Sequence, residues 1–140
     1  MINRHHIANY VIGGMALALS SVGMLIHHAV SARHTWPELG ADQKARIEEA
    51  VKSIPPHHID IYCMTPECAD MRDDLVETLK GARWDATATA AFGMPLPGIT
   101  VSPSTPEGRK LADALQSVLG IKVKLANIGM SEWAISIGRK

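Results

Sequence analysis

Several signatures that would identify an enzyme or a nucleic-acid-binding protein are missing from this chain. The 14 basic and 14 acidic residues cancel and aromatic residues make up only 4% of the sequence, so no basic face with interleaved aromatics points to nucleic acid. Neither a glycine-rich phosphate-binding motif nor the G-x-S-x-G pattern of serine hydrolases is present. We therefore expect no nucleic-acid partner and no cofactor, and no residue is identified as catalytic.

What the chain does have is an uninterrupted apolar run near its N-terminus, from Ile7 to Ile26. The run contains no Asp, Glu, Lys or Arg, and about twenty helical residues cover the roughly 30 Å of a bilayer core. We expect residues 1–30 to be a transmembrane anchor, which makes the membrane a partner of a single-pass protein. A cleaved signal peptide is the alternative, because Arg4 supplies a charged n-region and Val30-Ser31-Ala32 offers small residues for cleavage.

The orientation of this anchor depends on two opposing features. A short tail before a first apolar segment is typical of a signal-anchor, which exports the part that follows. Arg33, Lys44 and Arg46, beyond the run, favour instead a cytoplasmic location for that part. Of the two, we expect the periplasmic location. Gly14 and Ala18 stand at a spacing that allows two such helices to pack, so a homodimer is considered beside a protein partner.

Residues 31–56 are predicted to be a linker that contains an amphipathic helix. Thr35 and Glu38 form a capping-box pattern, and Pro37 suits the first turn of a helix. Apolar residues then recur at helical spacing, at Ile47, Ala50, Val51 and Ile54. The pair Pro55-Pro56 ends the helix.

Residues 57–140 contain an internal duplication. When Ile61–Leu79 is laid on Val101–Leu119 without a gap, Thr65-Pro66-Glu67 falls on Thr105-Pro106-Glu107. Each copy has an apolar strand, this Thr-Pro-Glu turn, an amphipathic helix, a glycine that suits a helix C-cap and a further strand. The pattern predicts two successive βαβ units.

The connections predict how the two units combine. A short link between the copies, residues 93–98, favours antiparallel pairing of the strands on either side of it, Arg83–Phe92 and Ile99–Ser102. This gives an α+β fold with the ferredoxin-like split βαββαβ arrangement, in which all helices cover one face. The second copy ends in two strands, Lys122–Ile128 and Trp133–Gly138, so we expect a fifth strand. The alternative is a three-layer open α/β sheet whose other face the linker helix covers.

One N-terminal span, a linker helix bearing Gln43, the strand Ile59–Cys63 and a leucine-rich helix ending near Trp84 follow one another in this chain. This layout resembles that of bacterial membrane-anchored α/β proteins, and the resemblance implies a place at the cell envelope. The strand order is also similar to that of envelope-located peptidoglycan-binding repeat modules. Their glycine-containing strand signature is replaced here by the sequence of residues 99–103. Neither resemblance supplies a catalytic residue.

The two Thr-Pro-Glu turns form the first candidate site. In the split arrangement the first and third strands are adjacent and parallel, so Thr65, Glu67, Thr105 and Glu107 would lie side by side at one sheet edge. Paired helix N-termini favour an anion, whereas the two carboxylates favour a cation or another polar ligand. Helix capping alone also accounts for both turns.

The two cysteines form the second candidate site. Cys63 closes a strand, and Cys68 lies at the start of the following helix, where the thiol pKa would be lowered. The pair could be plain core residues, a structural disulfide, a redox pair, or zinc ligands together with His57 or His58. The C-x4-C spacing matches no thioredoxin-like or zinc motif, so no metal site is assigned.

These patterns predict a non-enzymatic, membrane-tethered α/β module that binds or positions a partner at the bacterial envelope. The alternative is a thiol redox or metal-binding protein that uses Cys63 and Cys68.

Overall fold

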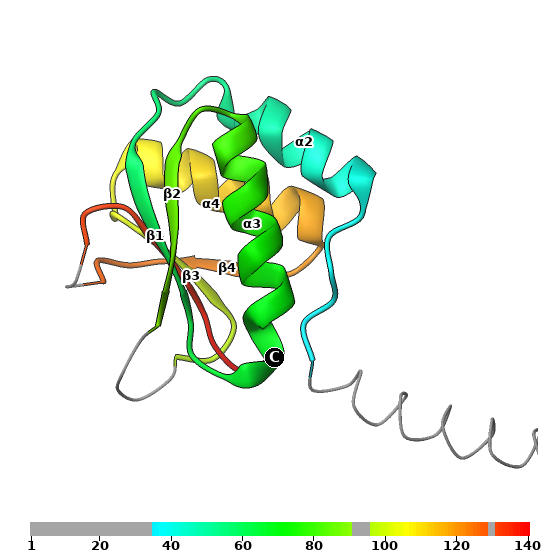
Figure 1. Ribbon diagram of the computed structural model, residues 1–140. Helices are drawn as coiled ribbons and strands as arrows, with labels where there is room; N and C mark the ends of the chain where they lie inside the picture. Colours follow the sequence, from blue (N-terminus) through cyan, green and yellow to red (C-terminus); the bar gives the residue numbers. More distant parts are fainter. Residues whose placement is uncertain (1–34, 91–95, 129–130) are drawn as a thin grey trace, which may run out of the picture. The chain divides into compact units, whose positions relative to one another are not determined.

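The computed structural model describes residues 35–90, 96–128 and 131–140 (Figure 1). In chain order these contain α2 (Ala41–Val51), β1 (His58–Cys63), the 3-10 helix η1 (Pro66–Cys68), α3 (Ala69–Gly81), β2 (Asp85–Ala90), β3 (Ile99–Ser102), α4 (Pro106–Leu119), β4 (Val123–Leu125) and β5 (Ala134–Ile137). The fold is α+β with a five-stranded mixed sheet, and the predicted fifth strand is present. The predicted anchor, residues 1–30, lies outside the described residues, and none of the helices within them is long and apolar enough to cross a bilayer.

The strands of the sheet follow the order β2-β1-β5-β3-β4. β1 is parallel to β2 and to β5, whereas β3 is antiparallel to β5 and parallel to β4. The predicted pairings of β1 with β3 and of β2 with β3 are therefore wrong. The last strand of the chain, β5, lies between the first pair of strands, β1 and β2, and the second pair, β3 and β4. β5 is suited to this central position because all four of its residues are buried, with isoleucines on one face and small residues on the other.

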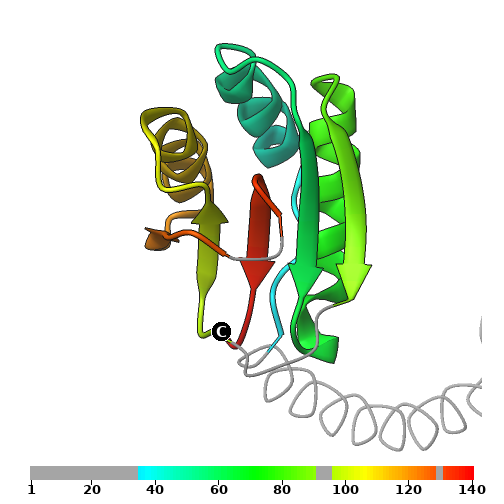
Figure 2. The ribbon, with the colours of Figure 1, turned by 90° about the vertical axis from the view of Figure 1, so that its left-hand side faces the viewer.

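The three helices form a single layer on one face of the sheet. α3 packs against β1 and β2, α4 packs against β3 and β4, and α2 contacts both α3 and α4. Viewed from the other face, the strands lie in front and the helices behind them (Figure 2). The predicted three-layer alternative is therefore wrong. α2 buries one stripe, Ile47 and Val51, and places it between the other two helices.

The core lies between these two layers. The inner face of the sheet presents Ile59 and Ile61 from β1 and, through the strand register, Ile135 and Ile137 from β5. Leucines from the helices meet them, and all of these side chains are fully buried, among them Leu75, Leu79, Leu111 and Leu115. The polar alternate positions of the strands consequently face the other side of the sheet.

The linker enters the domain in extended form. Trp36 is buried, its indole Nε1 donates to Gly138 O at 2.7 Å, and its backbone N donates to Glu67 O at 3.1 Å. The predicted capping box of Thr35 and Glu38 is wrong, because these contacts hold the segment outside the helix. α2 instead begins after Gly40, whose backbone N–H donates to Gln43 Oε1 at 2.9 Å.

Candidate functional site

The structure does not bring the two Thr-Pro-Glu turns together. Thr65 and Glu67 follow the end of β1, and Thr105 and Glu107 follow the end of β3. Because β1 runs parallel to β5 and β3 runs antiparallel to it, the two turns lie at opposite ends of the sheet. The prediction that they share one site is wrong, and each turn starts a helix on its own.

Cys63 and Cys68 are joined by a disulfide with a Cα–Cα distance of 5.6 Å. The carbonyl oxygen of Thr65 contacts both sulfurs, at 2.7 Å from Cys63 Sγ and 2.9 Å from Cys68 Sγ. Cys68 has no exposed surface, whereas Cys63 is half-buried. A partner thiol could therefore attack this bond only at Cys63.

The histidines considered as zinc ligands lie far from these sulfurs. His57 and His58 stand at the start of β1 and Cys63 at its end, about 16 Å away at 3.3 Å per residue. Within residues 35–90, 96–128 and 131–140, no group of His, Cys, Asp or Glu side chains is arranged to hold a metal ion.

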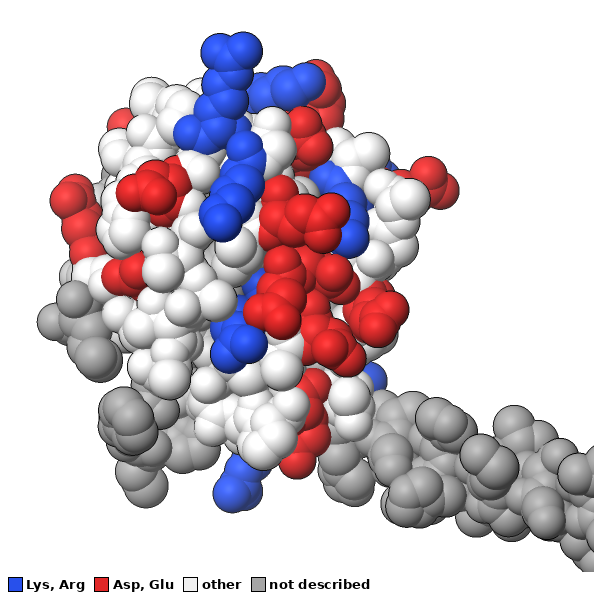
Figure 3. Space-filling view, viewed as in Figure 1, with Lys and Arg blue, Asp and Glu red and all other residues white. Residues whose placement is uncertain are grey.

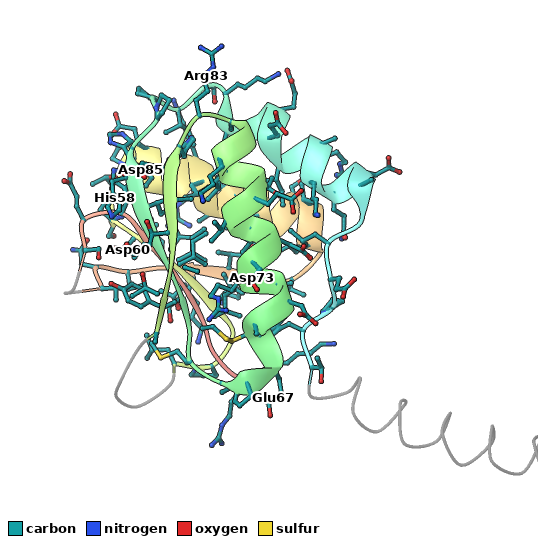
Figure 4. All side chains as sticks on the ribbon, in the orientation of Figure 1. His58, Asp60, Glu67, Asp73, Arg83 and Asp85 are labelled. Atoms are coloured by element: carbon teal, nitrogen blue, oxygen red, sulfur yellow. A yellow bond between two sulfur atoms is a disulfide. The ribbon has the colours of Figure 1, made fainter. Side chains whose placement is uncertain are left out.

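A different set of polar residues meets along β1, on the face of the sheet opposite the helices, where Figure 4 labels His58, Asp60 and Asp85. His58 Nδ1 lies 2.8 Å from Asp85 Oδ2, across the β1–β2 register, and His58 Nε2 lies 3.1 Å from Asp60 Oδ1. The second oxygen of Asp60 accepts a short hydrogen bond from Ser131 Oγ, and Ser131 Oγ lies 2.9 Å from Tyr62 Oη. We call these five residues the His58 network.

The His58 network has one consistent set of hydrogen-bond directions. Carboxylates only accept, so both ring nitrogens of His58 donate when the imidazole is protonated. Ser131 donates to Asp60, which leaves the Tyr62 hydroxyl to donate to Ser131. The hydrogen bond to Asp85 and the nearby charge of Asp60 raise the pKa of His58 above its ordinary value. The two carboxylates therefore stabilise the imidazolium form of His58.

A second histidine occupies the other face of β1. The His57 ring stacks on Trp133 with centroids 4.6 Å apart and meets the edge of Trp84 at 5.7 Å. Both tryptophans are buried, and Trp84 Nε1 is a buried donor with no hydrogen-bond partner among the residues that the structure describes. This cluster packs the residue that precedes β1 against the two buried tryptophans.

The geometry of the His58 network suits the binding of a polar ligand. Ser131 donates to the Asp60 carboxylate and not to the imidazole, so no Ser-His pair is formed. Both nitrogens of His58 are engaged by carboxylates, which leaves neither one free to take a proton from a substrate. The side chains of Asp85 and His58 are 79% and 54% exposed, so the network presents acceptor oxygens and a charged ring to solvent.

The acidic surface of the helix layer is the other polar feature of the domain. Acidic side chains gather over α3 and α2, with most basic ones towards the top of the view (Figure 3). A shallow groove between α2 and α3 lies here, lined by Ala41, Lys44, Ala45, Glu48, Glu77, Thr78 and Gly81. Lys44 Nζ lies 3.3 Å from Asp74 and 3.4 Å from Glu77, so it already neutralises part of the groove.

Sequence reasoning missed the His58 network, although three of its five residues have a local signal. His58, Asp60 and Tyr62 alternate with the buried isoleucines of β1, and this period-two pattern marks a polar strand face. Ser131 has no such signal, because it is 71 residues from its partner Asp60. Comparisons with protein-family models, with curated proteins and with solved structures gave no match to this chain.

Proposed function

We propose that this protein is a non-enzymatic, membrane-tethered module of the bacterial envelope that binds a partner through the His58 network. The observation that carries the proposal is the hydrogen-bond chain from Tyr62 to Asp85, which provides a positioned set of polar groups. The two carboxylates outnumber the single imidazolium. The network therefore favours a partner segment that brings hydrogen-bond donors or a positive charge.

The apolar run Ile7 to Ile26 supports the tether. The chain enters the domain at Trp36, next to Glu67 and Gly138, at the end of β1. His58 and Asp85 lie at the other end of that strand. A tether attached at residue 35 thus leaves the proposed binding surface away from its point of attachment.

The disulfide supports the periplasmic side of the membrane. Disulfides persist in oxidising compartments and are rare in the cytosol. The Cys63–Cys68 bond lies at the end of β1 that is opposite to His58, so it stabilises the module without taking part in the proposed surface.

Site-specific photo-crosslinking in intact cells tests this function. A photoreactive residue replaces Glu132, which is exposed and next to Ser131, and a control replaces Ser117, which is exposed on α4. We expect a covalent adduct with a partner from position 132, none from position 117, and loss of the first adduct when Asp60→Asn is added. An adduct that is indifferent to Asp60→Asn contradicts the proposed surface.

The same cells separate this function from the thiol alternative. Cys63→Ala combined with Cys68→Ala leaves the adduct at position 132 unchanged if the His58 network binds the partner. A redox protein would instead lose its partner together with the cysteines, and a mixed disulfide would be trapped by Cys68→Ala alone.

A further inference from the structure

The two edges of the sheet are protected to very different degrees. β4 forms one edge with only three residues, Val123–Leu125, and has Lys124 at its centre. β2 forms the other edge with six residues, Asp-Ala-Thr-Ala-Thr-Ala, and after Asp85 it carries no charge and no proline (Figure 2). Short length, lysine and proline are the usual means by which an edge strand avoids pairing. Only β4 uses them.

The unpaired side of β2 presents a regular row of backbone groups. Asp85 N donates to His57 O at 3.1 Å, towards β1. Successive strand residues point their N–H and C=O groups to alternate sides, so those of Ala86, Ala88 and Ala90 point away from β1. No other strand in the described residues pairs with this side.

We propose that the free edge of β2 pairs with the β2 of a second copy of this chain. The two strands run antiparallel about a two-fold axis at Ala88, which forms one continuous sheet. In this register Ala88 lies opposite Ala88 of the second copy, and Ala86 lies opposite Ala90. All the outward N–H and C=O groups of these three residues then form interchain hydrogen bonds.

The side chains of β2 suit this self-pairing on both faces. On the uncovered face Thr87 of one copy lies opposite Thr89 of the other, a favourable cross-strand pair. On the helix face only alanines meet, which leaves room for the two α3 helices to approach each other. Asp85 is kept at the far ends of the paired strands, so its charge does not face itself.

The charges of α3 favour a second copy over an unrelated peptide. The first half of the helix carries three aspartates and one arginine, Arg72, whose Nε lies 3.0 Å from Asp73, whereas Lys80 stands near its end and Arg83 follows it. In Figure 3 most of the visible basic side chains lie towards the top of the view, and the acidic ones gather below them. A two-fold axis at Ala88 places the two helices antiparallel, which brings the basic end of each towards the acidic end of the other.

The test is the oligomeric state of the full chain in detergent micelles, measured by native mass spectrometry and by sedimentation equilibrium. We expect a dimer for the wild type. Ala88→Lys and Ala88→Asp each place like charges opposite one another and should raise the dimer dissociation constant about tenfold or more. An equimolar mixture of the two variants should recover a dimer that contains one copy of each, which also shows that both variants are folded.

Ala126→Lys is the matched control, because Ala126 is also an exposed alanine and follows the other edge strand. It should leave the dimer unchanged. A monomeric wild type overturns the proposal, and so does a dimer that Ala88→Lys does not weaken. A dimer lost in Gly14→Leu and retained in Ala88→Lys assigns the contact to the apolar run and overturns it too. Failure of the mixture to recover a dimer assigns the edge to a different partner.

Discussion

The two strand-to-helix junctions of this chain start from the same three residues, Thr-Pro-Glu, and are closed in different ways. In the first half, the strand end and the helix start are joined by the Cys63–Cys68 disulfide. In the second half, Pro103 and Gly108 occupy the corresponding positions, and a Cβ added to Gly108 would lie only 1.8 Å from Pro103 O. A covalent bond in the first half and a close backbone contact in the second half thus both hold the end of a strand next to the start of the following helix.

The helix starts differ accordingly. Thr105 caps α4 directly, since its Oγ1 accepts from Gly108 N at 3.1 Å, and α4 begins at the next residue. Thr65 makes no such bond, and three residues of 3-10 helix precede α3. A shared turn sequence therefore does not determine the local geometry. The residues that close the junction on either side of the turn decide it.

The largest effect is expected from a substitution that breaks the second junction. In Gly108→Ala the added methyl group overlaps the carbonyl oxygen of Pro103, so the helix start must move away from the strand. We expect a loss of about 3 kcal/mol in the free energy of unfolding. Chemical denaturation of the full chain in mild detergent, followed by tryptophan fluorescence, measures it. Ser117→Ala, on the exposed face of the same helix, should change the value by less than about 0.5 kcal/mol, and an equal effect of both variants would refute this account.

The next largest effect is expected when the disulfide of the first junction is reduced. The disulfide closes a short loop, so reduction should lower the free energy of unfolding by about 2 kcal/mol. The measurement compares denaturation of the wild type with and without reductant. The double variant Cys63→Ala, Cys68→Ala serves as the control and should be indifferent to reductant. If reductant does not shift the wild-type midpoint, the bond does not contribute as described.

A smaller effect sharpens the contrast between the two caps. Thr105→Ala removes a side-chain cap and should cost about 1 kcal/mol, whereas Thr65→Ala removes none and should cost only a few tenths. The same denaturation measurement applied to both variants checks the difference. Equal losses in the two variants would mean that the junctions are capped alike.

The smallest expected effect concerns His58, the first residue of β1. Because the folded-state pKa of His58 is raised, its stabilisation is fully present below about pH 6.5, the unfolded value, and is lost as the pH rises through the folded value. Unfolding measured between about pH 5 and pH 9 should show this decline, and His58→Gln should abolish it. An NMR titration, with His58 assigned by difference from that variant, should give a midpoint above 6.5; a lower one contradicts the network.

The local elements of this fold were predictable from the sequence, and their arrangement was not. The predicted strand Ile99–Ser102 has the observed bounds of β3, and Gly120, at φ 68°, ends α4 as a C-cap glycine does. The strand order depends on β5, which pairs with β1 over about 70 residues of chain. The short link after β2 suggested a hairpin, although its length is also sufficient to reach past two strands at about 4.8 Å each.

For the candidate sites, too, the individual residues were predictable from the sequence and their grouping in space was not. Both cysteines and both Thr-Pro-Glu turns were found from their spacing, but their grouping in space follows from strand direction, which the sequence pattern did not resolve. His58 and Asp60 could have been found from the period of β1. Ser131 and Asp85 join them only because β5 and β2 lie on either side of that strand.

Trp36 has a mechanical consequence. Its indole is bonded to the residue that follows β5, and its backbone is bonded to the turn that follows β1. A pulling force applied through residue 35 is therefore passed first to the segments that follow β1 and β5, the two neighbouring strands in the middle of the sheet. The helix α2 comes after Trp36 in the chain, so these two hydrogen bonds shield it from the pull.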